Sequence, residues 1–337
     1  MSKRNSATLE QVAALAGVSR ATASRAINDS PRVSQRSREA VQEAIEKLGY
    51  VPNWAARSLV TRRTESIALV FGEPDTRLFP DPVLAGLVRG ISERLAGTEF
   101  QLVILLPHGL GRSAPLAHYL DNGHVDGVLF SSLHGEDSLP LKLAERGMPV
   151  VVNGRPTDAP VSYVDVDNLG GAHAAVEHLL DRGRRRIAEI RGPIDMGAAV
   201  DRHDGYRRAL AEARIKVDPS LVAIGEFTAG GADAAMRSLL ERRPDLDAVF
   251  AASDTMALSA LKVLHDQGRR VPEDVAVVGF DDTERAPEAD PPLTTVRQPV
   301  TRMGHAMAER MLQMITTGDT SPRTTVFDTE LIVRSST

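Results

Sequence analysis

The sequence of 337 residues contains no cysteine and few aromatic residues, which make up 4% of the chain. Without cysteine there is no disulfide, no thiolate-bound metal and no cysteine nucleophile. No uninterrupted apolar run approaches the roughly 18 residues that a membrane-spanning helix needs. The first residues are polar and lack the apolar segment of a secretory signal, so we expect a cytoplasmic protein without a membrane partner.

The sequence also lacks the motifs of common enzyme classes. It has no Gly-x-Ser-x-Gly nucleophile elbow and no phosphate-binding Walker loop. His173, Glu177 and His178 resemble a zinc motif only superficially, because their spacing matches no established pattern and the two histidines do not share a helical face. Asp281 and Asp282 are adjacent carboxylates, whose side chains point apart. We therefore expect no enzyme activity, no cofactor and no bound metal.

Charge is distributed unevenly along the chain. Residues 1–63 contain eleven lysines and arginines against five acids, a net charge of +6, and since the whole chain carries −5 the remainder carries −11. A basic head on an acidic body suits a protein whose head binds a polyanion that the body avoids. A solvated charged surface would give the same numbers, so charge alone does not decide between the two. The length predicts two or three domains.

The head has the pattern of a three-helix module. Thr8 opens a capping box, and apolar residues then recur on one helical face until Gly17 ends the first helix. Ser19 is placed to cap a second helix over residues 20–27, and a third helix is expected over 34–49. Two short helices joined by a turn that contains glycine form a helix-turn-helix arrangement.

The second helix has the surface of a DNA reader. Arginine bonds guanine bidentately, serine, threonine and asparagine offer shorter polar contacts, and Ala21 suits a thymine methyl. The alternative is a generic amphipathic bundle, but small residues on the exposed face favour close approach to a groove. The expected DNA contacts of the head are Thr8, Ser19, Arg20, Ala21, Thr22, Ser24, Arg25 and Asn28.

Residues 53–63 are expected to form a hinge helix and linker. Pro52 ends the preceding helix, and Asn53 can cap a helix of about seven residues, which is marginal alone in water. Such a helix would order only when something binds it. Leu59 could wedge between base steps of a minor groove, although a plain linker is the alternative. Asn53, Ala56 and Leu59 complete the expected DNA contacts.

Four short runs of the head occur in a specific order. They are Thr-Leu-x-x-Val-Ala-x-x-Ala-Gly-Val-Ser from Thr8, Thr22-x-Ser24-Arg25-x-x-Asn28, Val33-Ser34 and Gly49-Tyr50-x-Pro52-Asn53. In these runs the head resembles the DNA-binding domain of the LacI/GalR family of bacterial transcription regulators. The resemblance implies that Arg20, Ala21 and Arg25 enter the major groove and that residues 53–59 form the hinge helix.

Beyond residue 64, short apolar runs alternate with helical patterns. Strands are expected at 67–71, 101–106, 125–130, 150–153, 163–166, 187–190, 248–250 and 275–280, and helices at 83–96, 168–182, 201–213, 231–242 and 254–268. This alternation predicts parallel sheets covered on both faces. The expected fold is an all-α helix-turn-helix head plus an α/β body of two doubly wound parallel-sheet lobes, with a ligand cleft at the carboxyl ends of the strands.

The body resembles the effector domain of the same family, which is similar to periplasmic sugar-binding proteins. The motifs in family order include Asp126-Gly127-Val128, Asp201-Arg202, Ala252-Ser253-Asp254, Gly279-Phe280-Asp281-Asp282 and Pro291-Pro292-Leu293-Thr294-Thr295-Val296-Arg297-Gln298. The resemblance implies a DNA-binding domain at 1–52, the hinge at 53–63 and an effector-binding and dimerisation domain at 64–337. The first lobe would comprise 64–167 and 298–325, and the second 168–297 and 326–337.

The expected effector contacts are Glu73, Arg155, Arg202, Phe227, Asp254 and Asp281. Arg202 and Asp281 match family ligand positions best, and Phe227 matches an aromatic that stacks on a sugar face. Carboxylates accept hydrogen bonds from hydroxyls and arginine donates two, so the set suits a polyol better than a multiply charged phosphate. Asp254 could instead cap the helix that starts near Thr255. Gly154 stands where the family often has an aspartate, so the resemblance does not identify the sugar.

The expected function is that of a homodimeric transcriptional repressor of sugar uptake or catabolism genes. Each subunit would place its second helix in one half of a pseudo-palindromic operator in double-stranded DNA, and a small sugar effector would separate the hinge segments. Dimer surfaces are expected at 82–96 and 108–124, and a coiled-coil tetramer is not expected. The alternatives are an architectural DNA-binding protein with a ligand-free body, or a helix-turn-helix fused to a sugar-processing enzyme.

Overall fold

The computed structural model describes residues 7–27, 30–50, 63–72, 81–106, 113–135, 137–156 and 160–337. The chain divides into two compact units, Met1–Thr64 and Glu65–Thr337, each with its own hydrophobic core. The expected hinge helix lies outside the described residues, and so do Asn28, Asn53, Ala56, Leu59 and Glu73. None of the described helices is both long and apolar enough to cross a membrane.

The head folds as the three expected helices, α1 (Leu9–Leu15), α2 (Arg20–Ile27) and α3 (Gln35–Leu48). Thr8 and Gln11 close the predicted capping box, and Gly17 adopts a left-handed φ of +66° in the turn before α2. A small core of alanine and valine side chains joins the helices. The helix ends were predictable because each depends on a local cap rather than on distant packing.

The body contains two mostly parallel sheets. The first has the strand order β11-β5-β4-β3-β1-β2 and the second has the order β12-β10-β9-β8-β6-β7, with only β10 and β12 antiparallel among the described strands. The first sheet contains β1 (Ser66–Phe71), β2 (Gln101–Leu105), β3 (Gly127–Ser131), β4 (Val150–Asn153), β5 (Ser162–Val166) and β11 (Thr324–Phe327). The second contains β6 (Ile187–Arg191), β7 (Val222–Ile224), β8 (Ala248–Ala251), β9 (Ala276–Asp281), β10 (Thr294–Arg297) and β12 (Glu330–Ile332).

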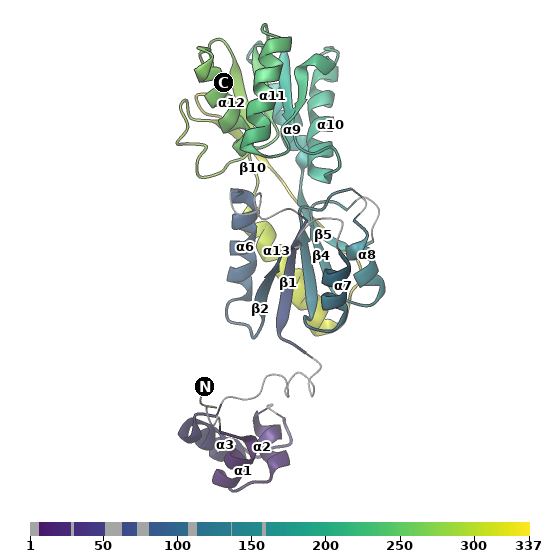
Figure 1. The fold of residues 1–337 in the computed structure, drawn as a ribbon, viewed down its shortest axis with the longest axis vertical. Coiled ribbons are helices and arrows are strands. Elements are labelled where there is room, and N and C mark those ends of the chain that lie inside the picture. The colour runs from purple at the N-terminus through teal and green to yellow at the C-terminus, as the bar shows by residue number, and fades with distance from the viewer. Residues whose placement is uncertain are drawn as a thin grey trace. The chain divides into compact units, whose positions relative to one another are not determined.

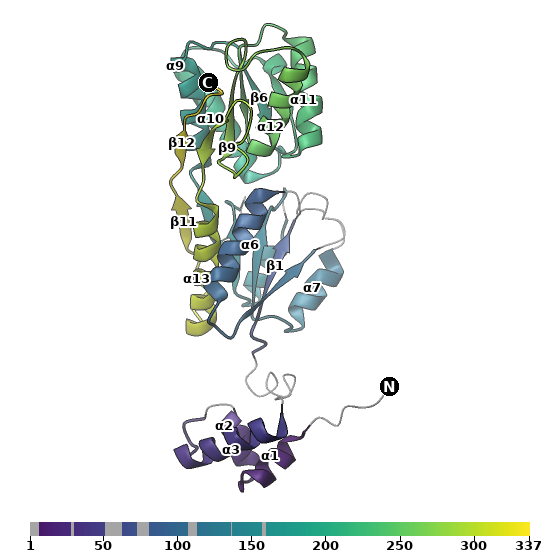
Figure 2. The same cartoon turned by 90° about the vertical axis from the view of Figure 1, so that its left-hand side faces the viewer.

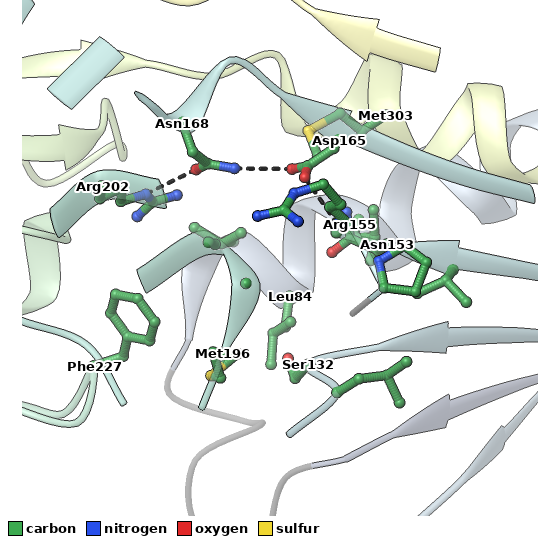
Figure 3. Close-up of a pocket in the computed structure, with 18 of the residues that line it drawn as sticks. Leu84, Ser132, Asn153, Arg155, Asp165, Asn168, Met196, Arg202, Phe227 and Met303 are labelled. Atoms are coloured by element: carbon green, nitrogen blue, oxygen red, sulfur yellow. Dashed lines mark hydrogen bonds between the residues drawn. The ribbon is translucent and has the colours of Figure 1, made fainter. Parts of the chain in front are cut away.

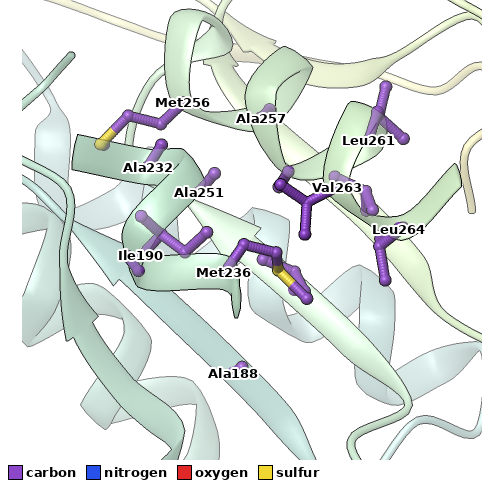
Figure 4. Close-up of a cluster of buried hydrophobic side chains, with 14 of the residues drawn as sticks. Ala188, Ile190, Ala232, Met236, Ala251, Met256, Ala257, Leu261, Val263 and Leu264 are labelled. Carbon is purple, nitrogen blue, oxygen red and sulfur yellow. The ribbon is translucent and has the colours of Figure 1, made fainter. Parts of the chain in front are cut away.

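Helices cover both faces of each sheet, as Figure 1 shows. On the first sheet, α6 (Pro82–Leu95) and α13 (Val300–Thr317) pack together on one face, and α7 (Ser113–Asp121) and α8 (Leu139–Glu145) lie on the other. On the second, α9 (Asn168–Asp181) and α10 (Gly197–Glu212) share one face. The opposite face is covered by α11 (Ala229–Arg242) and α12 (Asp254–Asp266), whose aliphatic and methionine side chains fill the core in Figure 4. The expected two-lobed α/β body is confirmed.

The chain crosses between the lobes at three places within residues 160–337. It passes from β5 to α9, from β10 to α13, and from β11 to β12. Figure 2 shows the last of these running along one side of both lobes. The expected boundary at residue 325 falls inside β11, which stays in the first sheet as far as Phe327, opposite Val166. These crossings make a shared hinge about which the lobes can move.

Candidate DNA-binding and effector-binding sites

The outer face of α2 presents the side chains expected to read DNA. Arg20, Ala21 and Arg25 are exposed, whereas Ala23 and Ala26 are buried against the other helices of the head. The long side chains are therefore free to enter a groove while the helix stays fixed by its inner face. The structure gives α2 the surface that groove recognition needs, and the individual DNA contacts stay predictions.

Several of the expected DNA-contacting residues also have partners inside the head. The Thr22 amide donates to Ser19 Oγ at 3.1 Å, so Ser19 caps α2, and Thr8 caps α1 in the same way. Arg20 Nε lies 2.9 Å from Glu10 Oε1 on α1. Both side chains of this ion pair are exposed, so the interaction is weak and the guanidinium can leave it to contact DNA.

A cavity of about 460 Å³ lies between the two lobes of the body. Its lining comes from segments that follow the carboxyl ends of strands, including Ser132 after β3, Arg155 after β4, Phe227 after β7 and Asp281 at the end of β9. Its volume falls in the range of roughly 300–1,000 Å³ typical of small-ligand sites. The ligand cleft expected from the alternation of strands and helices is present.

Arg202 on α10 is the central cation of this cavity. Its Nε donates to Asn168 Oδ1 at 2.9 Å and its Nη1 to the Ala252 carbonyl at 2.6 Å, and Nη1 lies 3.6 Å from Asp281 Oδ1. The guanidinium also stacks 3.6 Å from the centroid of the Phe280 ring. Burial lowers the pKa of Arg202, and the charge of Asp281 opposes that shift. Among the described residues Nη2 has no protein partner, which leaves it for a ligand.

Asp281 faces Arg202 from the end of β9. Gln298, at the crossing into α13, donates from Nε2 to Asp281 Oδ1 at 2.7 Å. Burial raises the pKa of the Asp281 carboxyl well above its usual range, and Arg202 opposes the rise. The backbone φ of Asp281 is +124°, a strained value for a residue other than glycine. Such strain persists where surrounding contacts fix a functional side chain.

Asp254 does not line the cavity, contrary to our expectation of a ligand contact. Its Oδ1 accepts from Thr295 Oγ1 at 2.5 Å and its Oδ2 from the Thr283 amide at 2.7 Å. The cap of α12 is the preceding residue, Ser253, whose Oγ accepts from the Met256 amide. Asp254 is thus neither a residue of the cavity lining nor the cap of α12. It is buried, and its hydrogen bonds join α12 to β10 and to the loop after β9.

A chain of hydrogen bonds runs along the hinge side of the cavity. Arg202 donates to Asn168, Asn168 Nδ2 donates to Asp165 Oδ1 at 2.9 Å, and the Arg155 amide donates to Asp165 Oδ2 at 2.9 Å. The Arg155 side chain then reaches back to Asp201, with Nη2 2.6 Å from Oδ1. Figure 3 shows Asn168 and Asp165 lying between the arginines. The network links both lobes through the crossing between β5 and α9.

Phe227 presents an aromatic face to the cavity beside Arg202. The guanidinium carbon of Arg202 lies 5.7 Å from the centroid of the Phe227 ring, and both side chains stand on the same side of the view in Figure 3. A Cβ on Gly192 would lie 2.3 Å from the Phe227 ring, so only glycine admits the ring at this place. Gly192 therefore positions the expected stacking residue.

The lining of the cavity carries more acids than bases. Among its described residues are the aspartates 81, 137, 165, 195 and 281 against only Arg155 and Arg202. Burial raises the pKa of the Asp165 carboxyl, while the amides of Val166 and Arg155 oppose the rise. A multiply charged anion is disfavoured in this surrounding, whereas hydroxyl groups find both donors and acceptors.

Four of the six expected effector residues line the cavity: Arg155, Arg202, Phe227 and Asp281. The sequence analysis missed Asp165, Asn168 and Gln298, which connect those residues to one another. A signal for them was present, because Asp165 and Asn168 stand at the end of an expected strand and Gln298 closes a specific motif. Their side chains became recognisable as site residues only when the crossings brought them beside Arg202 and Asp281.

Acid titration of the body should reveal Asp254. Burial raises its pKa to about 6 from an ordinary value of 3.8, so the folded chain holds this proton more tightly than the unfolded chain. The resulting stabilisation is complete below pH 3.8 and is lost as the pH rises through about 6. We expect Asp254→Asn to remove a fall in the free energy of unfolding on the order of 1–3 kcal/mol between pH 4 and 7, measured by urea denaturation with circular dichroism.

Asp274→Asn is the matched control for this titration. A hydrogen bond from Arg270 lowers the pKa of Asp274 from an ordinary value of 3.8 to about 2. The stability that the ionised Asp274 contributes is therefore fully present above pH 3.8 and is lost only as the pH falls through about 2. Between pH 5 and 7 this variant should keep the slope of the unmodified chain. Parallel profiles for Asp254→Asn and the unmodified chain would contradict the raised pKa.

Comparison with known proteins identifies the two parts of the chain. Residues 8–53 match the family "Bacterial regulatory proteins, lacI family", and residues 176–337 match "Periplasmic binding protein-like domain". The chain is 52% identical to the HTH-type transcriptional regulator CelR of Thermobifida fusca, with 100% of both chains covered. It is 34% identical to the HTH-type transcriptional repressor CytR of Escherichia coli K12, covering 99% of this chain and 97% of CytR.

Solved structures give the same result. A CelR–cellobiose complex is 50% identical, covers 98% of this chain and 100% of its own, and has a TM-score of 0.78. A lac repressor dimer bound to operator and the anti-inducer ONPF is 26% identical, with a TM-score of 0.86 and coverage of 98% and 99%.

A helix-turn-helix head followed by a two-lobed, periplasmic-binding-protein-like body defines an HTH-type transcriptional regulator. The chain belongs to the LacI family of bacterial regulatory proteins. The expected family, fold class and function as a DNA-binding transcriptional regulator are confirmed. The relatives are regulators and not enzymes, which also confirms that expectation and removes the enzyme fusion as an alternative.

Proposed function

We propose that the chain is a homodimeric repressor whose affinity for a pseudo-palindromic operator is changed by a small neutral sugar, with cellobiose as the first candidate. The observation that carries the proposal is the buried pair of Arg202 and Asp281 beside the open face of Phe227. CelR, which is similar to this chain over its full length, has been solved with cellobiose. We infer that the chain acts in the cytoplasm, where its operator lies.

The donor and acceptor set suits the hydroxyl groups of a sugar. Arg202 Nη2 can donate, and the carboxylates of Asp281 and Asp165 can accept. Phe227 can stack on the apolar face of a pyranose ring. Arg155, at the rim, adds a further donor beside its bond to Asp201. We keep Glu73 as an expected contact, and we assign Asp254 a supporting role behind the cavity wall.

The proposed dimer surface lies on the first lobe at the edge strand β2 and the helices α6 and α7. Among the described residues, β2 pairs only with β1, and Ile104 on β2 and Tyr119 on α7 are among the exposed large hydrophobic side chains. Exposed apolar residues along a sheet edge favour association. The helices α6 and α7 correspond to the segments expected at 82–96 and 108–124. A twofold dimer would present two copies of α2 to two half-sites.

The proposed switch couples the cleft to the operator through the first lobe. A sugar that bridges Arg202 on the second lobe and Arg155 on the first would fix the angle between the lobes at their shared hinge. In a dimer, a change in the angle between the lobes would change the separation of the two hinge segments at 53–63 and hence of the two heads. The usual coupling in such systems is about 1–3 kcal/mol, or about 5–150-fold in affinity.

Calorimetry and DNA binding together test the proposal. The full chain is titrated with cellobiose, glucose and a phosphorylated sugar, and its affinity for DNA selected from a random-sequence pool is measured with and without each compound. We expect binding of a neutral sugar, little binding of the phosphorylated one, and an affinity for selected DNA changed by about 5–150-fold. Tight binding of selected DNA without a response to any sugar would instead support a ligand-free body.

A further inference from the structure

The polar side chains that the first lobe contributes to the cavity are mostly bonded within the protein. Asp81 Oδ1 accepts from the Val83 amide at 2.9 Å, and Asn153 Oδ1 accepts from Ser131 Oγ at 3.0 Å. The same holds for Asp137, Arg155 and Asp165. Each of these groups would have to share or give up a protein hydrogen bond in order to hold a ligand.

Ser132, directly after β3, differs from these residues. It is half-buried in the cavity lining, and its hydroxyl has no protein partner among the described residues. Ser138 is the other such hydroxyl of the first-lobe lining, but it is exposed at the start of α8. Figure 3 shows Ser132 among the lining side chains, on a different element from Arg202 and Phe227. The first lobe therefore offers the cavity one half-buried group that is free both to donate and to accept.

The backbone holds Ser132 in a conformation that serine disfavours. Its φ is +58°, in the left-handed region, where Cβ comes too close to the following carbonyl oxygen. A Cβ on Gly72, directly after β1, would overlap the Ser132 carbonyl oxygen, so glycine at 72 admits this backbone. Glycine at 132 would adopt the same φ without strain. A strained serine beside a cavity therefore indicates that its side chain has a role that glycine could not fill.

The deep groups of the cavity belong to one lobe only. Arg202 and Phe227 both stand on the second lobe and move together, so contacts with them add affinity without favouring any angle between the lobes. On the first lobe, Arg155 is already bonded to Asp201 of the second, and Asp165 stands beside the crossing into α9, where the lobes move least. A sugar contact at the end of β3, two strands beyond β5 in the sheet order, would change with the lobe angle.

We propose that Ser132 is the first-lobe contact of the sugar and determines how strongly the sugar changes operator affinity. The inference rests on the proposed sugar-responsive function and identifies a residue through which the same site acts. The sugar lies against Arg202 and Phe227, and the Ser132 hydroxyl forms a hydrogen bond with a sugar hydroxyl on the side that faces the first lobe. This bond forms when the lobes approach and is lost when they separate, so it stabilises one lobe arrangement relative to the other.

Calorimetry on the free and the DNA-bound chain tests the inference. The full chain and its Ser132→Ala variant are titrated with cellobiose, each alone and each saturated with selected operator DNA. We expect the substitution to weaken cellobiose binding about 3–10-fold in one of the two forms, as for a lost neutral hydrogen bond, and by less than about twofold in the other. Because coupling between sites is reciprocal, the effect of cellobiose on operator affinity should change by the ratio of these two losses.

Ser132→Gly separates the hydroxyl from the backbone strain. We expect the same loss of cellobiose affinity together with a rise of about 1–4 °C in the midpoint of thermal unfolding, because relief of the left-handed strain exceeds the backbone entropy that glycine loses on folding. Arg214→Gly is the matched control, since Arg214 has a φ of +59° and is exposed after α10, outside the cavity lining. Its substitution should raise the midpoint by a similar amount and leave cellobiose binding unchanged.

The outcomes distinguish this inference from the proposed function. Equal weakening by Ser132→Ala in both forms would show that the hydroxyl contacts the sugar without responding to the lobe angle, and unchanged affinity in both would show that it makes no contact. Either result, or normal cellobiose binding by Ser132→Gly, would overturn the inference and leave the sugar-responsive function standing. Failure of the unmodified chain to bind cellobiose would overturn the cellobiose assignment itself, and the role of Ser132 with it.

Discussion

Replacing Arg202 with methionine is expected to raise the dissociation constant for the effector by about a hundredfold. The substitution removes Arg202 Nη2, which has no protein partner among the described residues, and a hydrogen bond to a charged group contributes about 1.5–3 kcal/mol. It also leaves Asp281 buried without a counter-charge. We expect a loss of about 3–5 kcal/mol in the free energy of unfolding, measured by urea denaturation, with effector affinity measured by calorimetry.

A second substitution separates binding from folding. In Arg202→Met with Asp281→Asn the buried pair carries no uncompensated charge, and asparagine has the same shape as aspartate, so it adds no backbone strain at position 281 beyond that of the native residue. We expect this double variant to regain most of the lost stability without regaining effector affinity. Arg207→Met serves as the control, since Arg207 lies on the same helix with a side chain 58% exposed and paired with Asp204. Recovery of effector binding in the double variant would show that Arg202 acts only by holding the fold.

The head was predictable from sequence nearly to the residue. Thr8, Ser19 and Ser34 each cap the helix that follows them, and Gly49 takes a left-handed conformation after α3. These signals act within four residues, so no tertiary information is needed to place the helix ends. The exposed face of α2 followed from the same periodicity, because the buried alanines define the opposite face.

The body was predictable where a strand carries an apolar run, including the partly exposed β2, whereas β10 was missed although its first three residues are buried. The strand at 150–153 matched β4, whose apolar residues are enclosed by helices on both faces. The edge strand β11 was missed because it reads Thr-Thr-Val-Phe and is largely exposed, which gives no apolar run. The helices α7, α8 and α13 were also missed. The position of α13 in the first lobe depends on a chain crossing that local pattern does not encode.

The residues of the cavity also divide into those that sequence motifs could predict and those that only the tertiary structure places. Arg202, Phe227 and Asp281 could be predicted to line the cavity because each stands in a recognisable motif or family position. Asp254 was misplaced because its motif indicates a helix start near the cleft, whereas Thr283 and Thr295 turn its carboxylate into the protein. The contact of His134 with Asp195 had no sequence signal, since the two residues are joined only by the approach of two lobes.

Replacing Arg25 with alanine is expected to weaken operator binding by about a hundredfold or more while barely changing non-specific binding. Arg25 is exposed on α2, and its side chain has no partner among residues 7–27 and 30–50, so its fork is available to a base edge. A bidentate contact contributes about 1–3 kcal/mol of discrimination, and a dimer makes it in both half-sites. Arg25→Lys keeps the charge without the fork and should lose most of the same discrimination.

Lys47→Ala controls for charge in this experiment. Lys47 lies at the end of α3, with a side chain 62% exposed and paired with Glu43, so its loss removes the same positive charge from another face of the head. Fluorescence anisotropy on selected operator and on scrambled DNA, over a range of salt concentrations, measures the specific and the non-specific affinity. A phosphate-only role for Arg25 would weaken binding to both DNAs equally and lower the salt dependence by about one unit of slope. A base-reading role reduces the ratio between the two DNAs, because only the specific complex presents the correct base edge to Arg25.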